Sequence, residues 1–78
     1  MRTFVTDTIA IKKLMVENDI KTTKELSEKS GVNRNTLAKI INGKMQPTSD
    51  VMEKLILTLN INPNNAGEIF FTRNLRTA

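Results

Sequence analysis

The 78-residue sequence contains no cysteine and no histidine. Their absence excludes disulfides, thiolate nucleophiles and the usual zinc sites, and it removes the side chain most often used as a general base near neutral pH. The sequence also has no Gly-rich phosphate loop and no cluster of carboxylates at catalytic spacing. We therefore expect a protein that is not an enzyme and that uses no metal, no cofactor and no small-molecule substrate.

Aromatic residues and long apolar runs are scarce as well. There are three Phe and no Trp or Tyr, which argues against a stacking platform for single-stranded nucleic acid. The N-terminal stretch lacks the apolar segment of a secretory signal. The apolar runs, such as 9–11 and 55–57, are far too short to span a bilayer. The expected location is the cytoplasm, without membrane contact.

Positive charge is concentrated in one part of the chain. The net charge is +4, and residues 21–46 contain six basic residues and two acids, whereas the rest of the chain is balanced. A local basic patch is the expected footprint of a polyanionic partner. Charge alone fits a solvated face of an ordinary basic protein equally well.

The spacing of apolar residues predicts helices almost throughout and no strand. Five helices are expected, at about 8–18, 23–30, 33–41, 49–59 and 63–71. In the capping box TTKE, Thr22 is expected to accept from the Glu25 amide and Glu25 to reach back to the Thr22 amide. Gly31 is expected to end the second helix in left-handed geometry. The prediction is one domain, 1–78, with a core at about 8–71, a short arm at 1–7 and a tail at 72–78.

The third predicted helix, within SGVNRNTLAKIINGK, has two contrasting sides. At 100° per residue, Leu37 and Ile40 share one side, and Asn35 and Lys39 lie opposite. Arg34 lies on a flank with a long reach. Amides suit the edge of adenine, and Arg or Lys suits guanine, so the outer side carries groups that read DNA in the major groove.

Two short helices joined by a tight Gly turn, followed by a long apolar helix, suggest a helix-turn-helix. The sequence resembles the helix-turn-helix domain of the phage repressor and Cro group over about 9–70, through ELS, SGV, TLAKIINGK, QP and LNIN. The resemblance implies an all-α fold, a five-helix lambda-repressor-like bundle. Ser27 replaces the more usual Ala and fits sterically. Ser30 is polar where a hydrophobic or small residue is common, which predicts looser packing there.

The resemblance also implies roles for individual residues. The positions that contact bases in the family correspond here to Asn33, Arg34, Asn35 and Lys39. The positions that contact the DNA backbone correspond to Thr23, Asn42 and Lys44. Three of these residues also fit simpler roles, since Asn33 suits an N-cap, Lys39 an ordinary surface lysine, and Asn42 before Gly43 a helix end.

Apolar residues near the C-terminus form a candidate partner interface: Ile69, Phe70, Phe71 and Leu75. Helical spacing prevents Phe70 and Phe71 from both pointing inward. We expect Phe70 to pack on the core and Phe71 to join a partner surface. The alternative is that both fold back against the first or fourth helix.

These observations lead to two hypotheses of different classes. The first is a sequence-specific repressor of the Cro type in a bacterial host, which binds a double-stranded DNA operator with helix 33–41 in the major groove, with a homodimer as one arrangement. The second is an interaction protein, similar to an antirepressor or an antitoxin, which associates with a partner repressor or another protein and controls its DNA occupancy. A basic recognition helix is compatible with both.

Overall fold

The computed structural model describes residues 4–73. In chain order its elements are β1 (Phe4–Val5), α1 (Thr8–Glu17), α2 (Thr23–Ser30), α3 (Arg34–Ile41), α4 (Ser49–Thr58), α5 (Pro63–Phe70) and β2 (Thr72–Arg73). The predicted all-α, five-helix bundle with a helix-turn-helix is confirmed. The two short strands were not predicted.

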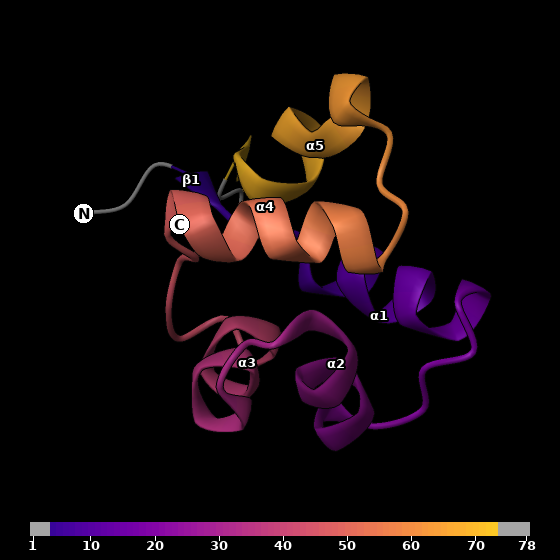
Figure 1. The fold of residues 1–78 in the computed structure, drawn as a ribbon. Coiled ribbons are helices and arrows are strands. Elements are labelled where there is room, and N and C mark those ends of the chain that lie inside the picture. Colours follow the sequence, from indigo (N-terminus) through magenta and orange to yellow (C-terminus); the bar gives the residue numbers. More distant parts are fainter. Residues whose placement is uncertain (1–3, 74–78) are drawn as a thin grey trace.

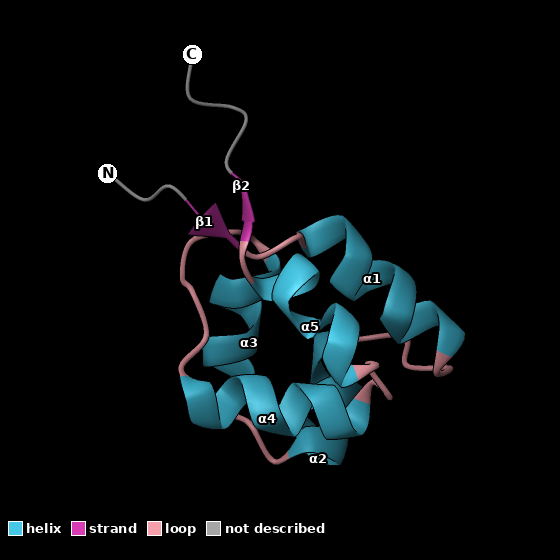
Figure 2. Ribbon diagram, turned by 90° about the horizontal axis from the view of Figure 1, so that it is seen from above, coloured by secondary structure: helices cyan, strands magenta, loops and turns pink. Residues whose placement is uncertain are grey.

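The helices form two groups around a shared core (Figure 1). Helices α2 and α3 lie together at one end of the molecule, and α4 and α5 lie at the other. Helix α1 contacts both groups, since it packs against α3 and α5. Figure 2, seen from above, shows the helices arranged around a common centre. Helix α3 is therefore at the surface on one side and against the core on the other.

Side chains from every helix meet in this core. The fourth helix contributes Leu55, and Leu59 follows directly after its last turn. Ile20 fills the core from the turn after α1, and Phe70 does so from α5. The buried cluster comprises Ile11, Met15, Ile20, Leu26, Val32, Leu37, Leu55, Leu59, Ile61 and Phe70. A close-packed cluster of this kind supplies the main apolar burial of so small a domain.

Side-chain caps set where the helices begin. Asp7, Thr22, Asn33, Thr48 and Asn62 each accept a hydrogen bond from the first turn of the helix that follows. Such caps satisfy amides that have no partner inside the helix. These starts agree with the predicted ones because capping depends on local sequence.

One half of the predicted capping box at α2 is wrong. The Thr22 hydroxyl does accept from the Glu25 amide, at 3.1 Å. The Glu25 carboxylate, however, accepts from the Lys21 amide at 3.4 Å and not from the Thr22 amide. Thr22 has an extended backbone (φ −136°, ψ 161°), which brings the preceding amide within reach of the carboxylate.

Backbone hydrogen bonds hold the two ends of the described chain side by side. Strands β1 and β2 pair antiparallel, with Phe4 opposite Arg73 and Val5 opposite Thr72. The Asp7 amide also donates to the Ile69 carbonyl at 2.7 Å. Residues from the expected arm and the expected tail thus pack as one ribbon beside α5. Among residues 4–73, no helix is long and apolar enough to cross a membrane.

Candidate nucleic-acid interface

The turn between α2 and α3 is held by a glycine and two serines. Gly31 has φ +77°, a left-handed conformation that glycine adopts without penalty. The Ser27 hydroxyl donates to the Val32 carbonyl at 2.6 Å. The Ser30 hydroxyl donates to the Leu26 carbonyl at 2.6 Å and accepts from the Val32 amide at 3.2 Å. The polar Ser30 side chain thus closes the turn through its hydroxyl, a role that the expectation of looser packing there did not include.

Helix α3 lies with its aliphatic side against the core. Leu37 and Ile40 are both 0% exposed. Arg34, Asn35 and Lys39 are all exposed on the other sides of the helix. The 100° spacing thus predicted correctly which side of the helix is buried. The amide of Asn35 and the cations of Arg34 and Lys39 are available to a partner.

Asn33 acts as the N-cap of α3. Its Oδ1 accepts from the Asn35 amide at 2.8 Å and from the Thr36 amide at 3.3 Å. The side-chain oxygen is therefore engaged inside the protein, while Nδ2 has no hydrogen-bond partner among the described residues. Any contact of Asn33 with a base must come through this donor.

The loop after α3 folds back onto the helix. The Asn42 amide donates to the Ala38 carbonyl at 3.0 Å, and the Lys44 amide donates to the Lys39 carbonyl at 2.8 Å. Gly43 between them has φ +75°. The side chains of Asn42 and Lys44 are both exposed, next to the end of α3. Their positions suit a surface contact as well as helix termination.

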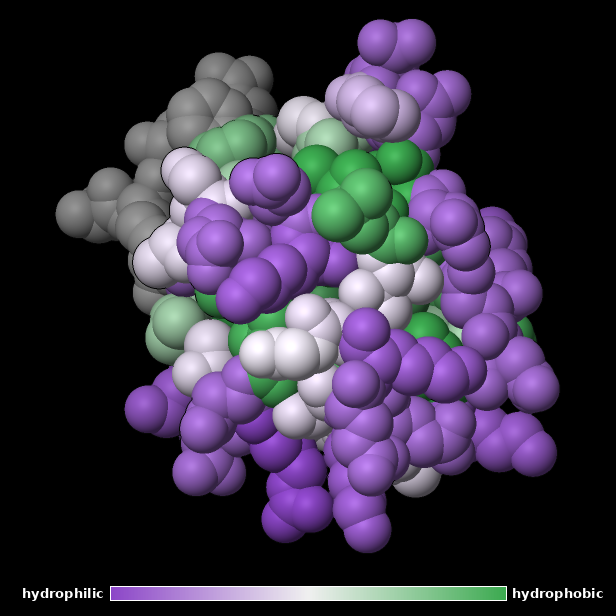
Figure 3. All heavy atoms as spheres, in the orientation of Figure 1, coloured by the Kyte–Doolittle hydropathy of each residue, from purple (hydrophilic) through white to green (hydrophobic). Residues whose placement is uncertain are grey.

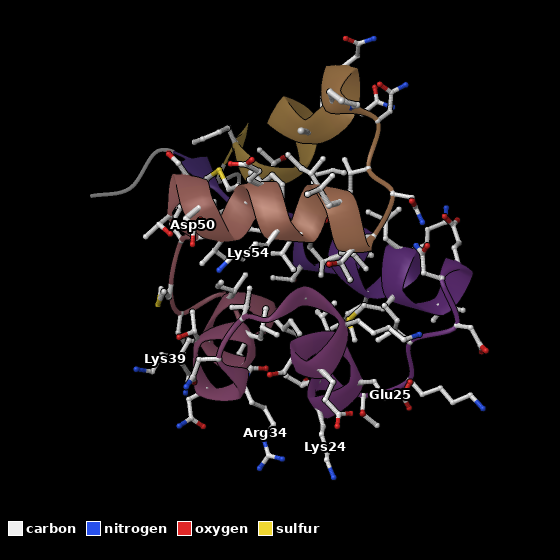
Figure 4. All side chains as sticks on the ribbon, viewed as in Figure 1. Lys24, Glu25, Arg34, Lys39, Asp50 and Lys54 are labelled. Carbon is white, nitrogen blue, oxygen red and sulfur yellow. The ribbon has the colours of Figure 1, made fainter. Side chains whose placement is uncertain are left out.

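The start of α2 lies at the same end of the molecule. Thr23 is the first residue of α2 and is half-buried. Figure 4 shows Lys24 and Arg34 extending in the same direction, away from the body of the protein, from α2 and α3. Sequence reasoning did not assign Lys24 to the site, although its place in the first turn of α2, beside Thr23, could have suggested it.

Among residues 4–73, the cations of this surface lack acidic partners. Helical spacing favours a pair between Glu25 and Lys29 along α2, but in this part of the chain the ion pair that forms joins Asp50 and Lys54 on α4, at 3.2 Å. Figure 3 shows hydrophilic surface over the end formed by α2 and α3, whereas a hydrophobic patch lies where α4 meets α5. Unpaired cations over a polar surface favour an anionic partner at the α2–α3 end.

The candidate partner residues near the C-terminus separate into different environments. Phe70 is 1% exposed and belongs to the core, so it is not accessible to a partner. Phe71 is 52% exposed, and Ile69 is half-buried against the core. Leu75 lies outside the described residues. The two side chains separate where α5 ends, because Phe70 is its last residue and Phe71 follows with a non-helical backbone (φ −127°, ψ 47°).

The described residues contain no group of three or more His, Cys, Asp or Glu side chains placed to hold a metal ion.

Comparison with known proteins gives one family. A family model for the Cro/C1-type helix-turn-helix DNA-binding domain matches residues 10–68, from α1 to α5. No curated protein and no solved structure matches the chain.

Proposed function

The chain belongs to the Cro/C1-type helix-turn-helix family of DNA-binding domains, and from this premise we propose that it is a sequence-specific transcriptional repressor of the Cro type. It would bind a double-stranded operator in the cytoplasm of a bacterial host with α3 in the major groove. The observation that carries this proposal is the orientation of α3. Leu37 and Ile40 are fully buried, while Asn35 and Lys39 face solvent on the opposite side.

Base recognition is assigned to Arg34, Asn35 and Lys39, with a smaller part for Asn33. An exposed Asn can form two hydrogen bonds with adenine, and Arg or Lys can bind the O6 and N7 of guanine. The Asn33 oxygen already caps α3, so this side chain can offer only its Nδ2 donor. Direct readout would therefore depend mainly on the other three side chains.

Backbone contacts are assigned to Thr23, Asn42 and Lys44, to which we add Lys24. The start of a helix presents free amides and a positive dipole end, which suit a phosphate. Lys24 extends in the same direction as Arg34 (Figure 4), and Lys44 is exposed at the other end of α3. These contacts would fix the position of the domain on DNA, and the base contacts would specify the sequence.

A two-fold homodimer would place two such domains on paired half-sites about one helical turn, ~34 Å, apart. Phe71, which is 52% exposed directly after α5, is the proposed centre of the contact, with the accessible edge of Ile69 beside it. Sizing the protein with and without a Phe71→Asp substitution tests this contact. A variant with unchanged fold, DNA affinity and oligomeric state would remove Phe71 from the interface.

Selection of bound duplexes from a random pool tests the main proposal, followed by gel shifts of the selected and a random duplex over a range of salt concentrations. The expected result is a defined operator that binds more tightly than random duplex at every salt concentration. Binding to both should weaken as salt rises, because phosphate contacts release counterions. Equal affinity for operator and random duplex would contradict sequence-specific recognition.

One observation favours the second function, an interaction protein similar to an antirepressor or antitoxin. Large hydrophobic side chains are exposed on elements other than α2 and α3, namely α1, α4 and the residue after α5: Ile9 (71%), Val16 (77%), Leu57 (72%) and Phe71 (52%). A contiguous exposed apolar patch often marks contact with another protein, and Figure 3 shows such a patch where α4 meets α5. Absence of any duplex binding by the purified protein, together with a larger complex in the presence of a partner repressor, would support this function over the first.

A further inference from the structure

Gln46, in the loop between α3 and α4, binds residues from both ends of the chain. Its Oε1 accepts a hydrogen bond from the Thr6 hydroxyl at 2.9 Å. Its Nε2 donates to the carbonyl of Phe70. The Phe70 carbonyl can only accept, so the nitrogen of the amide must face it and the oxygen must face Thr6. Both ends of one side-chain amide are thus occupied by partners distant in sequence.

The partners of Gln46 are themselves held firmly. Thr6 is 6% exposed and directly follows β1, which pairs with β2. The Asp7 amide donates to the Ile69 carbonyl at 2.7 Å, next to the Phe70 carbonyl that Gln46 binds. Figures 1 and 2 both show β1 beside the loop that leads into α4. Gln46 therefore attaches this loop to the place where the two ends of the described chain are hydrogen-bonded to each other.

The other end of the same loop is attached to α3. The Lys44 amide donates to the Lys39 carbonyl at 2.8 Å. Pro47, directly after Gln46, is buried. Lys44 and Met45 are thus held between an attachment to α3 on one side and an attachment to the paired chain ends on the other. Surface loops are usually more mobile than the elements they connect, and this loop is tied at both ends.

We propose that Gln46 is a positioning residue for DNA binding, which keeps the loop of Asn42 and Lys44 ordered in the free protein. This inference rests on the proposed function, because it concerns a loop that contacts phosphate only if the protein binds DNA. A loop ordered before binding loses less conformational freedom when it meets DNA. Gln46 would raise affinity without touching the nucleic acid itself.

The first test needs no DNA. Gln46→Leu removes both hydrogen bonds and keeps a similar side-chain size, and amide exchange by NMR reports on the order of the loop. Exchange at the Lys44 amide, which donates to the Lys39 carbonyl, should be several-fold faster than in the unchanged protein, while the core amides of α1 should be unaffected. Thr6→Val, which removes one of the two bonds, should have a smaller effect in the same direction, and Thr6→Ser, which keeps the hydroxyl, should have none.

The second test measures duplex affinity in a double-mutant cycle with Lys44→Ala. Gln46→Leu alone should lower affinity for operator and random duplex alike, by about three- to tenfold, the range expected when a loop must be ordered on binding. If Gln46 acts by placing Lys44, the double variant should lose less than the product of the two single losses. General destabilisation would instead give independent losses once the folded fraction is taken into account.

The two tests separate this inference from the proposed function. Unchanged exchange at the Lys44 amide in both Gln46→Leu and Thr6→Val would overturn the inference, whatever the protein binds. Faster exchange with independent losses in the cycle would also overturn it, because the loop would then be ordered without a use in DNA binding. Failure of the unchanged protein to bind any duplex would refute the proposed function, and the positioning role with it. If Gln46→Leu does not fold, Thr6→Val with Thr6→Ser as its matched control decides both tests.

Discussion

Helices α3 and α4 have similar inner sides and different outer sides. Both bury leucine in the shared core, Leu37 from α3 and Leu55 from α4, at 0% and 1% exposure. The outer side of α4 carries its own counter-charge, since Lys54 lies 3.2 Å from Asp50. The outer side of α3 has cations and an amide and contains no acid.

This difference separates what stabilises the fold, the buried leucines, from what would bind a partner, the charges on the outer side. The buried leucines hold each helix in the bundle, and they would do so whatever faced the solvent. A lysine that already has an acid partner gains less from a phosphate than an unpaired one, because the existing pair must be replaced. We therefore expect substitutions on the inner sides to affect α3 and α4 alike, and substitutions on the outer sides to affect DNA binding only at α3.

The largest expected effect comes from the inner sides. Leu37→Ala and Leu55→Ala should each lower the free energy of unfolding by about 2–5 kcal/mol, because each removes buried methyl groups and leaves a cavity. Denaturant titration measures the loss. The matched control is Leu57→Ala on the outer side of α4, where the side chain is 72% exposed. We expect that change to stay within about 0.5 kcal/mol. A Leu37→Ala loss no larger than the control would show that α3 is not anchored as described.

The next effect belongs to the outer side of α3 alone. Arg34→Ala and Asn35→Ala should each weaken specific DNA binding by about 1–3 kcal/mol and relax discrimination at one base position. Competition binding with operators changed at single positions measures both quantities. Glu53→Gln, on the exposed side of α4, should leave the base preference unchanged. Loss of discrimination in Glu53→Gln of the same size would place α4, and not α3, against the bases.

Two glycines, one just before α3 and one inside α5, should respond to alanine substitution with opposite signs. Gly31, just before α3, has φ +77°, and an added Cβ would meet no atom within 4 Å. Gly31→Ala should therefore destabilise through backbone conformation alone, by about 1–2 kcal/mol. Gly67, inside α5, also has open space around it. Gly67→Ala should stabilise by about 0.5–1 kcal/mol, since glycine is unfavourable inside a helix. Thermal unfolding measures both, and destabilisation by both substitutions would contradict the assignment of Gly31 as a conformational requirement.

Local sequence predicted most of the fold. The start of α2 at Thr23 and the start of α5 at Pro63 agree with the structure because caps and proline act within one turn. The burial of Leu37 and the outward position of Lys39 follow from helical spacing. For the same reason the orientation of the candidate site could be predicted before any contact between helices was known.

What the sequence could not predict depends on contacts between distant residues. Strands of two residues, such as Phe4–Val5, are too short to show a period of two. The bonds of Gln46 join residues 40 and 24 positions away, and no local pattern marks them. Ser30 is a different case, because a hydroxyl at the end of α2 could have been expected to bond to a carbonyl one turn earlier. Its polarity is the means of closing the turn.

The smallest expected effect compares two lysines, one at the end of α3 and one on α4. Lys44→Gln should weaken binding to all duplexes alike and make the slope of log affinity against log salt shallower by about 1, because one phosphate contact is lost. Lys54→Gln should leave this slope unchanged. This substitution should instead lower the free energy of unfolding, by no more than about 0.5 kcal/mol, since the pair with Asp50 is exposed and spans one helical turn.

The two lysine variants have the same change of charge, so a general effect of net charge on DNA binding would appear in both. Equal slopes for Lys44→Gln and Lys54→Gln would mean that the protein attracts DNA only through its overall charge of +4. A shallower slope for Lys44→Gln alone would require a phosphate close to that side chain. The contrast between an unpaired and a paired lysine therefore decides whether the surface around α3 is a defined contact or only a positive region.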